Sequence, residues 1–408
     1  ENYGTQAGGI YAEYKAGHDE WGDDEPGTVL ENIIIRNNQS NWCSGVFIKT
    51  ANYEWPPYIE KIKLNNLLIE NNDIGIPGAG PIDGDHVILK NSIIRDNVGG
   101  NNGGGGGAFN NATLINVLVE GNRGSSIGGI RLRGGYYDAV TLINVTTSNN
   151  LKTSGTDEFL GIAIEYAYTA NIINCILMDK LYVDDNYEPT INLANTNTYG
   201  GVEFELLVNA NYISGNIALD PQFADTSNGD YSLSALSPCI SAGTSSITIT
   251  DDDGDGVEYT APEDDVDGNP RPNPDGSLPD IGAYESIYGV VPHYGPVWYV
   301  DASVELPYGN GGPGSPYHTI GQGIAAASDG DTVSVAAGTY VENINFYGKK
   351  IAVMGEDKAT TIIDGNQSGS VVIMEDTGED ALLSGFTVKN GSGLVLENGH
   401  TSGGGIYI

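Results

Sequence analysis

An acidic segment in the second half of the chain, DDDGDGVEYTAPEDDVDGNP over residues 251–270, has residue types and spacing that suit a bound cation. Asp251, Asp253 and Asp255 alternate and are followed by Gly256. A turn at the glycine would bring the three carboxylates around one point, as in calcium-binding loops. The segment therefore predicts a calcium site, and a solvated acidic loop without metal is the alternative.

The residues after Gly256 would supply the remaining calcium ligands. The carbonyl of Val257 is placed to join the carboxylates, but Pro262 stands where an EF-hand has its bidentate Glu. Asp264 or Asp265 would supply the missing oxygens. We expect calcium here to be structural, because it would brace a long loop against its own repulsion.

Candidate catalytic bases are scarce, and the sequence assigns no catalytic residue. The arginines of the coil region are Arg36, Arg95, Arg123, Arg131 and Arg133. Arg131 and Arg133 in IRLR would point to one face of a strand. A polysaccharide lyase needs acids that hold calcium and a basic residue at the substrate's α-proton, whereas a glycosidase needs paired carboxylates across a groove. No local signature of either enzyme is present, so a carbohydrate-active module is the second hypothesis.

Aromatic side chains give a related possibility, because tyrosine and tryptophan rings stack on sugars. The alternative, packing of loops on the wall of the fold, is at least as strong. The candidates are Tyr136, Tyr137, Tyr166, Tyr168, Trp21, Trp42 and Trp55.

The elements that must position these groups belong to a repeat. Between residues 29 and 180 one phrase recurs, as in VLENIIIRNN, IKLNNLLIENN and VILKNSIIRDN. Each copy holds an Asn in the same place, at intervals of 25 to 34 residues: Asn32, Asn66, Asn91, Asn116, Asn144 and Asn174. An aliphatic residue stands two positions before each Asn. Another aliphatic residue stands three positions after each Asn, except after Asn144, where this position is Thr147.

This pattern predicts an all-β fold, a parallel β-helix (β-solenoid) in which each coil buries its aliphatic residues against its neighbours. The recurrent Asn predicts a ladder of side-chain amides bonded from coil to coil, and a simple preference of Asn for turns is the alternative. The frame reappears near the other end in DALLSGFTVKNGSG, where Gly385 replaces the Asn. The solenoid therefore restarts there.

Charge limits the partners. The chain has 54 Asp and Glu against 17 Lys and Arg, a net charge of −37. Such repulsion argues against nucleic acid and favours cations as ligands. No apolar run reaches the ~18 residues of a membrane span. Cys43, Cys175 and Cys239 are too few for a disulfide scaffold, although the last two would pair if the end of the repeat folded back.

Several motifs resemble a known family. DPQFAD at 220–225, GDYSL at 229–233, SPCI at 237–240 and DIGAYE at 280–285 resemble the closing region of secreted bacterial right-handed parallel β-helix proteins. These belong to the pectate-lyase-like superfamily, in particular the choice-of-anchor Q domain type. Ser241 departs from that family, which usually has Asp there. The resemblance implies a right-handed parallel β-helix, an irregular closing region that carries the calcium loop, and an extracellular or cell-surface location.

The last part of the chain resembles the opening of the same superfamily. WYVDAS at 298–303 and the following HTIGQGIAAASDGDTVSVAAGTYVENI imply a short capping helix at about His318 to Ala327. Ile320, Ile324 and Ala327 share a helical face, and a terminal coil needs such a cap over its apolar cross-section. We expect coils over 1–180, a closing region over 181–290, and a cap with the first coils of a second or continuing β-helix over 291–408.

The two ends of the chain carry similar phrases. Gly8, Gly9, Ile10 and Tyr11 match Gly404, Gly405, Ile406 and Tyr407 at a constant offset. Either this is a repeat on the scale of a whole module, or ordinary coils simply look alike. The order of closing region and cap indicates a chain cut from a tandem array or one that assembles head to tail. The sequence therefore predicts a structural extracellular module that associates with itself, with polysaccharide as the second candidate partner.

Overall fold

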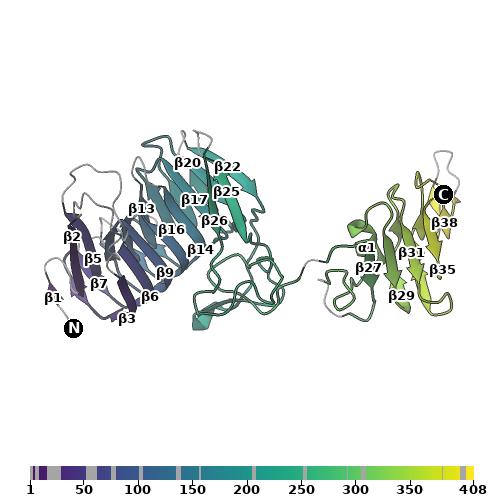
Figure 1. The fold of residues 1–408 in the computed structure, drawn as a ribbon, viewed down its shortest axis with the longest axis horizontal. Helices are drawn as coiled ribbons and strands as arrows, with labels where there is room; N and C mark the ends of the chain where they lie inside the picture. The colour runs from purple at the N-terminus through teal and green to yellow at the C-terminus, as the bar shows by residue number, and fades with distance from the viewer. Residues whose placement is uncertain are drawn as a thin grey trace, which may run out of the picture. The chain divides into compact units, whose positions relative to one another are not determined.

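The structure is a computed structural model of the chain. It describes residues 3–4, 9–15, 29–51, 62–74, 80–100, 104–134, 139–155, 158–204, 208–250, 255–291, 293–304, 309–378, 380–395 and 401–408. Over these residues it consists of β-strands with one short α-helix and one 3₁₀ turn. The chain divides into two compact units, Glu1–Gly289 and Val290–Ile408, and Figure 1 shows the strands of each unit stacked in sequence order.

The first unit is a parallel β-helix, as predicted. Its strands form three sheets that run along the coils. One sheet contains β3 (Val29–Arg36), β6 (Ile62–Glu70), β9 (Val87–Arg95), β11 (Thr113–Glu120), β14 (Val140–Ser148), β17 (Thr169–Ile173), β18 (Ile176–Leu177), β20 (Thr190–Ala194) and β22 (Asn209–Ser214). We call it the bent sheet.

The second sheet, called here the flat sheet, lies on another side of the coils. It contains β2 (Ile10–Lys15), β5 (Cys43–Ala51), β8 (Gly80–Asp85), β10 (Gly107–Asn110), β13 (Ile130–Arg133), β16 (Glu158–Glu165), β19 (Lys180–Val183), β21 (Val202–Phe204), and β12 (Arg123–Gly124) with β15 (Leu151–Lys152). A short third sheet joins β1 (Tyr3–Gly4), β4 (Gln39–Ser40) and β7 (Asp73–Ile74). The first coils thus visit the three sheets in turn, and single bridges from Asp73 to Val98 and from Val98 to Arg123 continue the third line of pairing. This is the path of a β-helix.

The aliphatic residues of the repeat lie in register, as the sequence predicts. Leu64 pairs with Leu30 on one side and Leu89 on the other, and the column continues through Leu114, Leu142 and Ile172. The column that includes Thr147 is aligned in the same way. From Leu64 onward, the side chains of both columns are almost fully buried in one core that runs through the coils. Because each coil buries its apolar face only against its neighbours, stacking supplies the stability of this unit.

The recurrent Asn gives the bent sheet its shape. All six predicted Asn residues have φ between 48° and 57°, a left-handed conformation that Asn tolerates better than most residues. The chain turns a corner at each one, within the strand for the first five and between β17 and β18 for Asn174. In the second unit Gly385 holds the same position with φ 82°, which glycine adopts at no steric cost.

After the last coil the chain folds back on the bent sheet. This closing region contains β23 (Phe223–Asp225), a 3₁₀ turn (Thr226–Asn228), β24 (Asp230–Leu233), and the antiparallel hairpin of β25 (Ser246–Thr250) and β26 (Gly256–Thr260). Ile249 of the hairpin packs on Ile143, Ile173 and Ala194 of the coils. All three cysteines are buried and free, so Cys175 and Cys239 are not paired.

The second unit is a shorter stack of the same kind. One sheet contains β27 (Val297–Val300), β28 (Thr332–Val335), β31 (Ala352–Gly355) and β34 (Leu382–Ser384), and a second contains β29 (Gly338–Val341), β32 (Thr361–Asp364) and β35 (Thr387–Lys389). The third contains β30 (Ile344–Asn345), β33 (Val372–Ile373) and β38 (Ile406–Tyr407), and β36 (Leu394–Val395) pairs with β37 (Thr401–Ser402) in a hairpin.

The predicted capping helix is α1 (Ile320–Ala326). Thr319 and Gln322 form a capping box at its start. Both oxygens of Glu342 accept hydrogen bonds from the first backbone N–H groups, and Lys349 Nζ donates to carbonyls of the last turn. Ions of opposite sign thus neutralise the two ends of the helix dipole. Ile320 and Ile324 are buried on the first coil of the unit.

Candidate functional sites

The predicted Asn column has two uses. Away from the closing region its amides bond to one another, as in Asn66 Nδ2 to Asn32 Oδ1 at 2.6 Å and Asn116 Nδ2 to Asn91 Oδ1 at 2.9 Å. The ladder is interrupted, because the amide of Asn91 donates to Asn65 rather than to Asn66. It resumes weakly from Asn174 Nδ2 to Asn144 Oδ1 at 3.4 Å. Paired rungs, and not one continuous ladder, therefore describe this column.

From Asn116 onward the same column holds the closing region. Asn144 Nδ2 donates to the carbonyls of Asp280 and Gly282, at 3.1 and 2.9 Å. Asn116 reaches the carbonyl of Asp264, Asn174 that of Thr244 and Asn195 that of Ala242. Each left-handed Asn thus aims its amide at backbone carbonyls of the closing region, which helps to satisfy their hydrogen-bonding capacity. This docking role has no local signal in the sequence.

A second Asn column forms the continuous ladder. It lies six residues after the first, or five at its last rung, inside the coils. Its rungs are joined by side-chain hydrogen bonds of 2.7 to 3.0 Å. From Asn72 to Asn150, each amide Nδ2 also donates to a strand carbonyl, as Asn122 does to that of Ile94. The rungs are Asn38, Asn72, Asn97, Asn122, Asn150 and Asp179. The repeated Asn at the end of each phrase was the signal available for it.

The last rung is a carboxylate. Asp179 Oδ2 accepts from the backbone N and the Nδ2 of Asn150 at 3.1 and 2.7 Å. Its residue is 3% exposed, and burial raises its pKa to about 6 against these hydrogen bonds. The native state therefore holds a proton on this group more tightly than the unfolded chain does.

Asp179→Asn should raise the free energy of unfolding at pH 7.5 by up to about 3 kcal/mol, because a neutral amide accepts the same two hydrogen bonds without a buried charge. The wild-type group is protonated in the native state below about pH 6. Wild-type stability therefore gains from acidification between pH 6 and 4, and the advantage of the variant should fade there. Urea unfolding at pH 7.5 and 4.5 measures this. An advantage that is equal at both values contradicts the assignment.

A buried charge cluster lies at the centre of the closing region. Arg271 Nε is 3.0 Å from Glu285 Oε2, and neither side chain is exposed. The guanidinium also donates to Asn116 Oδ1 and to the carbonyl of Gly282. Burial, followed by the charge of Asp280, raises the pKa of Glu285 to about 7, while Arg271 acts in the opposite direction. One cation thus joins the closing region to the coils.

The calcium prediction lies mostly outside the described residues, since Asp251 and Asp253 belong to an undescribed stretch. Asp255 precedes β26, which contains Val257, and Asp264 is exposed. Asp265 is 1% exposed, and its carboxylate accepts hydrogen bonds from the backbone N–H groups of Asp267, Asn269 and Glu285. No group of three or more metal-type side chains gathers among the described residues. The calcium site remains a prediction.

The outer face of the flat sheet brings several polar groups together. Register places Asp83 and Arg131 on either side of Ala108, two coils apart. Arg131 and Arg133 both face Glu165, at 3.3 and 3.7 Å. The indole of Trp42 donates to Asp83 at 2.9 Å, and burial raises the pKa of this Asp.

This face has the residue types of an acid–base site, although both guanidiniums already have a carboxylate partner. Among the other aromatic candidates, Tyr168 stacks on Tyr187 with ring centroids 4.7 Å apart, and Tyr166 meets the same ring edge-on. Tyr166 and Tyr168 therefore pack on one shared ring, that of Tyr187. Trp21, Trp55, Tyr136 and Tyr137 lie outside the described residues.

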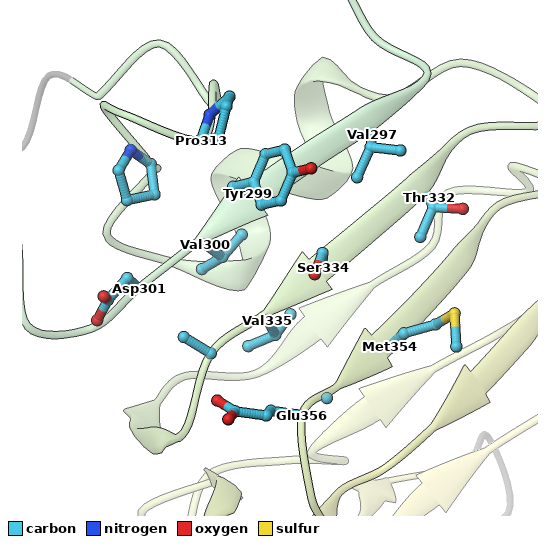
Figure 2. Close-up of a pocket in the computed structure, with 13 residues that line it drawn as sticks. Val297, Tyr299, Val300, Asp301, Pro313, Thr332, Ser334, Val335, Met354 and Glu356 are labelled. Atoms are coloured by element: carbon cyan, nitrogen blue, oxygen red, sulfur yellow. The ribbon is translucent and has the colours of Figure 1, made fainter.

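A groove of about 520 Å³ lies on the second unit, where sequence reasoning placed no site. Its floor is formed by β27, β28 and β31, and a loop that carries Pro313 and Pro316 borders it (Figure 2). Tyr299 lies on the floor, and Asp301 and Glu356 lie toward one end. No lysine, arginine or histidine is among the described residues that line it.

The candidate self-association residues lie on strands at the limits of the sheets. Ile10 is on β2, the last strand of the flat sheet, and pairs with Val46. Ile406 and Tyr407 form β38, also the last strand of its sheet, where Ile406 pairs with Val372. The backbone of Tyr11 belongs to β2 and Gly9 lies next to Gly45, whereas Gly8 is outside the described residues. Gly404 and Gly405 lead into β38.

Comparisons with known proteins give no relative. No family model matches the chain, and neither the curated proteins nor the solved structures contain a match. The superfamily resemblance therefore rests on the motifs in the sequence.

Proposed function

We propose that this chain is a structural module of an extracellular or cell-surface protein, repeated head to tail as a continuing β-solenoid. The open strand edges support this most. β2 and β3 are the last strands of their sheets in the first unit, and β34, β35 and β38 those of the second. Such edges present unpaired backbone groups that another strand can satisfy.

Exposed apolar side chains support the same proposal. Ile34 on β3 is 60% exposed, and Ile406 on β38 is 43% exposed. At the other limit of the second unit, α1 covers the core with Ile320 and Ile324. Solenoid ends without a cap are expected to bind matching ends, because stacking continues both the core and the sheets. No helix in the described part of the chain is long and apolar enough to cross a membrane.

Ile406→Asp and Ile10→Asp should each abolish end-to-end association, since a charge in the joining coil must be desolvated. Electron microscopy and sedimentation of the purified chain measure filament length. The matched control is Tyr212→Asp. Tyr212 lies on β22, the end strand of the bent sheet opposite β3, and its side chain is exposed as that of Ile406 is. Filaments that survive both isoleucine changes, or that depend on Tyr212, would contradict the proposal.

The role proposed for calcium is to brace the acidic loop near Asp255. Chelation should then loosen filaments or lower the melting temperature, and calcium alone should restore both. An unchanged melting temperature would leave the loop as a solvated acidic segment.

A carbohydrate-active module is the second candidate, favoured by the polar face around Asp83, Arg131 and Arg133. Lyase activity on, or binding to, an acidic polysaccharide with calcium present, lost on replacing Arg131 or Arg133 with alanine, would favour it over the structural role.

A further inference from the structure

The groove on the second unit has a floor built from three adjacent strands. Tyr299 of β27, Ser334 of β28 and Met354 of β31 form one row across the sheet by register. Figure 2 shows the Tyr299 ring over this floor, with the loop of Pro313 beside it. The row therefore offers a broad apolar surface with a hydroxyl at its centre.

Two carboxylates follow at the carboxyl ends of these strands. Asp301 and Glu356 come directly after the paired positions of β27 and β31, with Ala336 between them. Two strand steps put their backbones roughly 10 Å apart. Asp301 Oδ1 accepts from Ser303 N at 2.8 Å and Glu356 Oε2 from Ala337 N at 3.0 Å. Each carboxylate is thus oriented by a backbone N–H group.

Charge decides which ligands fit. The hydrogen bonds from Ser303, with a smaller contribution from the charge of His318, lower the pKa of Asp301. Asp301 is therefore ionised at neutral pH. Because no lysine, arginine or histidine is among the described residues that line the groove, an acidic ligand would be repelled, and a ligand with an ammonium group would be attracted.

The sheet also distinguishes a sugar from a peptide. Among the floor strands, β28 lies between β27 and β31, and β31 lies between β28 and β34. The outer side of β27 bonds to the neighbouring loop, from Tyr299 N to the carbonyl of Gly311 and from Tyr317 N to the carbonyl of Tyr299. Their backbone groups are therefore not open to strand addition by an extended peptide. A sugar ring needs a flat apolar surface for its C–H face and side-chain oxygens for its hydroxyl and amino groups, and this groove supplies both.

We infer that the groove binds an oligosaccharide containing free amino sugars, with a ring on Tyr299 and ammonium groups at Asp301 and Glu356. This site is independent of the proposed end-to-end association, since its floor strands β27, β28 and β31 are not among the edge strands proposed to join neighbouring modules. It is also distinct in charge preference from the acidic polysaccharide considered for the first unit.

Isothermal titration of the full chain with a chitosan hexamer at 150 mM salt tests the inference, because this salt screens distant charges of so acidic a protein. Asp301→Asn with Glu356→Gln should weaken binding by at least about tenfold, and Tyr299→Ala by roughly fivefold. Melting temperatures show whether each variant is folded.

Two controls remove the same groups elsewhere on the second unit. Glu375→Gln with Asp376→Asn deletes two exposed carboxylates. Tyr347→Asn deletes an exposed ring at a position with φ 51°, which Asn tolerates. Both should leave binding unchanged. A fully acetylated hexamer should bind about tenfold more weakly if the ammonium groups are recognised.

Several results would overturn the inference. These are no binding of the hexamer, an equal loss in the control variants, or equal binding of the acetylated hexamer or of polygalacturonate. Binding of a lysine-rich peptide that depends equally on Tyr299 and Glu356 would assign the groove to a basic protein segment instead.

Discussion

Arg271→Ala should lower the free energy of unfolding by about 3–5 kcal/mol, because it leaves buried carboxylates without their cation. Glu285 is the direct partner at 3.0 Å, and Asp280 adds a second buried acid beside it. The same change removes the hydrogen bonds from the guanidinium to Asn116 and Gly282. The closing region should therefore separate from the coils before they unfold. Urea unfolding measures the loss, and hydrogen exchange at Gly282 and Ala283 locates it.

The acidic partner supplies the control. Arg271→Met combined with Glu285→Gln should recover about half of the loss, because a neutral pair needs no charge compensation. The deficit of Arg271→Ala should also shrink between pH 8 and pH 5.5. Burial raises the pKa of Glu285, so the native state of the variant gains a proton there before the unfolded chain does. A loss below about 1 kcal/mol, or one that grows on acidification, would contradict this account.

Asn122→Ala should cost about 3–5 kcal/mol, because this rung of the inner ladder satisfies several buried groups at once. Its Oδ1 accepts from the backbone N and Nδ2 of Asn97, and its Nδ2 donates to Ile94 and Asn150. Asn122 itself has no exposed surface. Neighbouring coils lose their partners together, so the midpoint of urea unfolding should fall without a second transition.

The outer column offers a matched control. Asn66 is exposed and has one side-chain bond, to Asn32. Its φ of 53° would be strained in alanine, so glycine is the appropriate replacement, as at Gly385. Asn66→Gly should cost less than about 1 kcal/mol. Equal losses at Asn66 and Asn122 would mean that burial does not distinguish the two columns.

Much of the fold could be predicted because it depends on local pattern. A coil of a β-helix packs only on its neighbours, so the same residues recur at each corner and each inward position. The spacing of Leu64, Leu89 and Leu114 along the chain is therefore enough to predict that they pair in register. The capping helix is equally local, since Thr319 and Gln322 form its capping box within four residues.

The sites could be predicted less well, because they join segments far apart in the chain. Asn116 bonds to Asp264 across 148 residues, and nothing near Asn116 indicates that its amide is taken by the closing region. Asp265 has the residue type of a calcium ligand, but it bonds its own loop and the N–H of Glu285. The type of a side chain does not by itself predict whether its partner is a metal ion or a hydrogen-bonding group from a distant segment.

Residue spacing within one or two coils is enough to predict the parallel β-helix and its apolar columns. Long-range contacts decide which Asn column forms the buried ladder and which one docks the closing region. They also decide that Arg271 is the buried cation of that region, and that Tyr299 and Glu356 share a groove. Burial explains the difference. Whether a polar side chain bonds within the ladder, bonds to the closing region or lines a groove depends on which distant segment removes it from water.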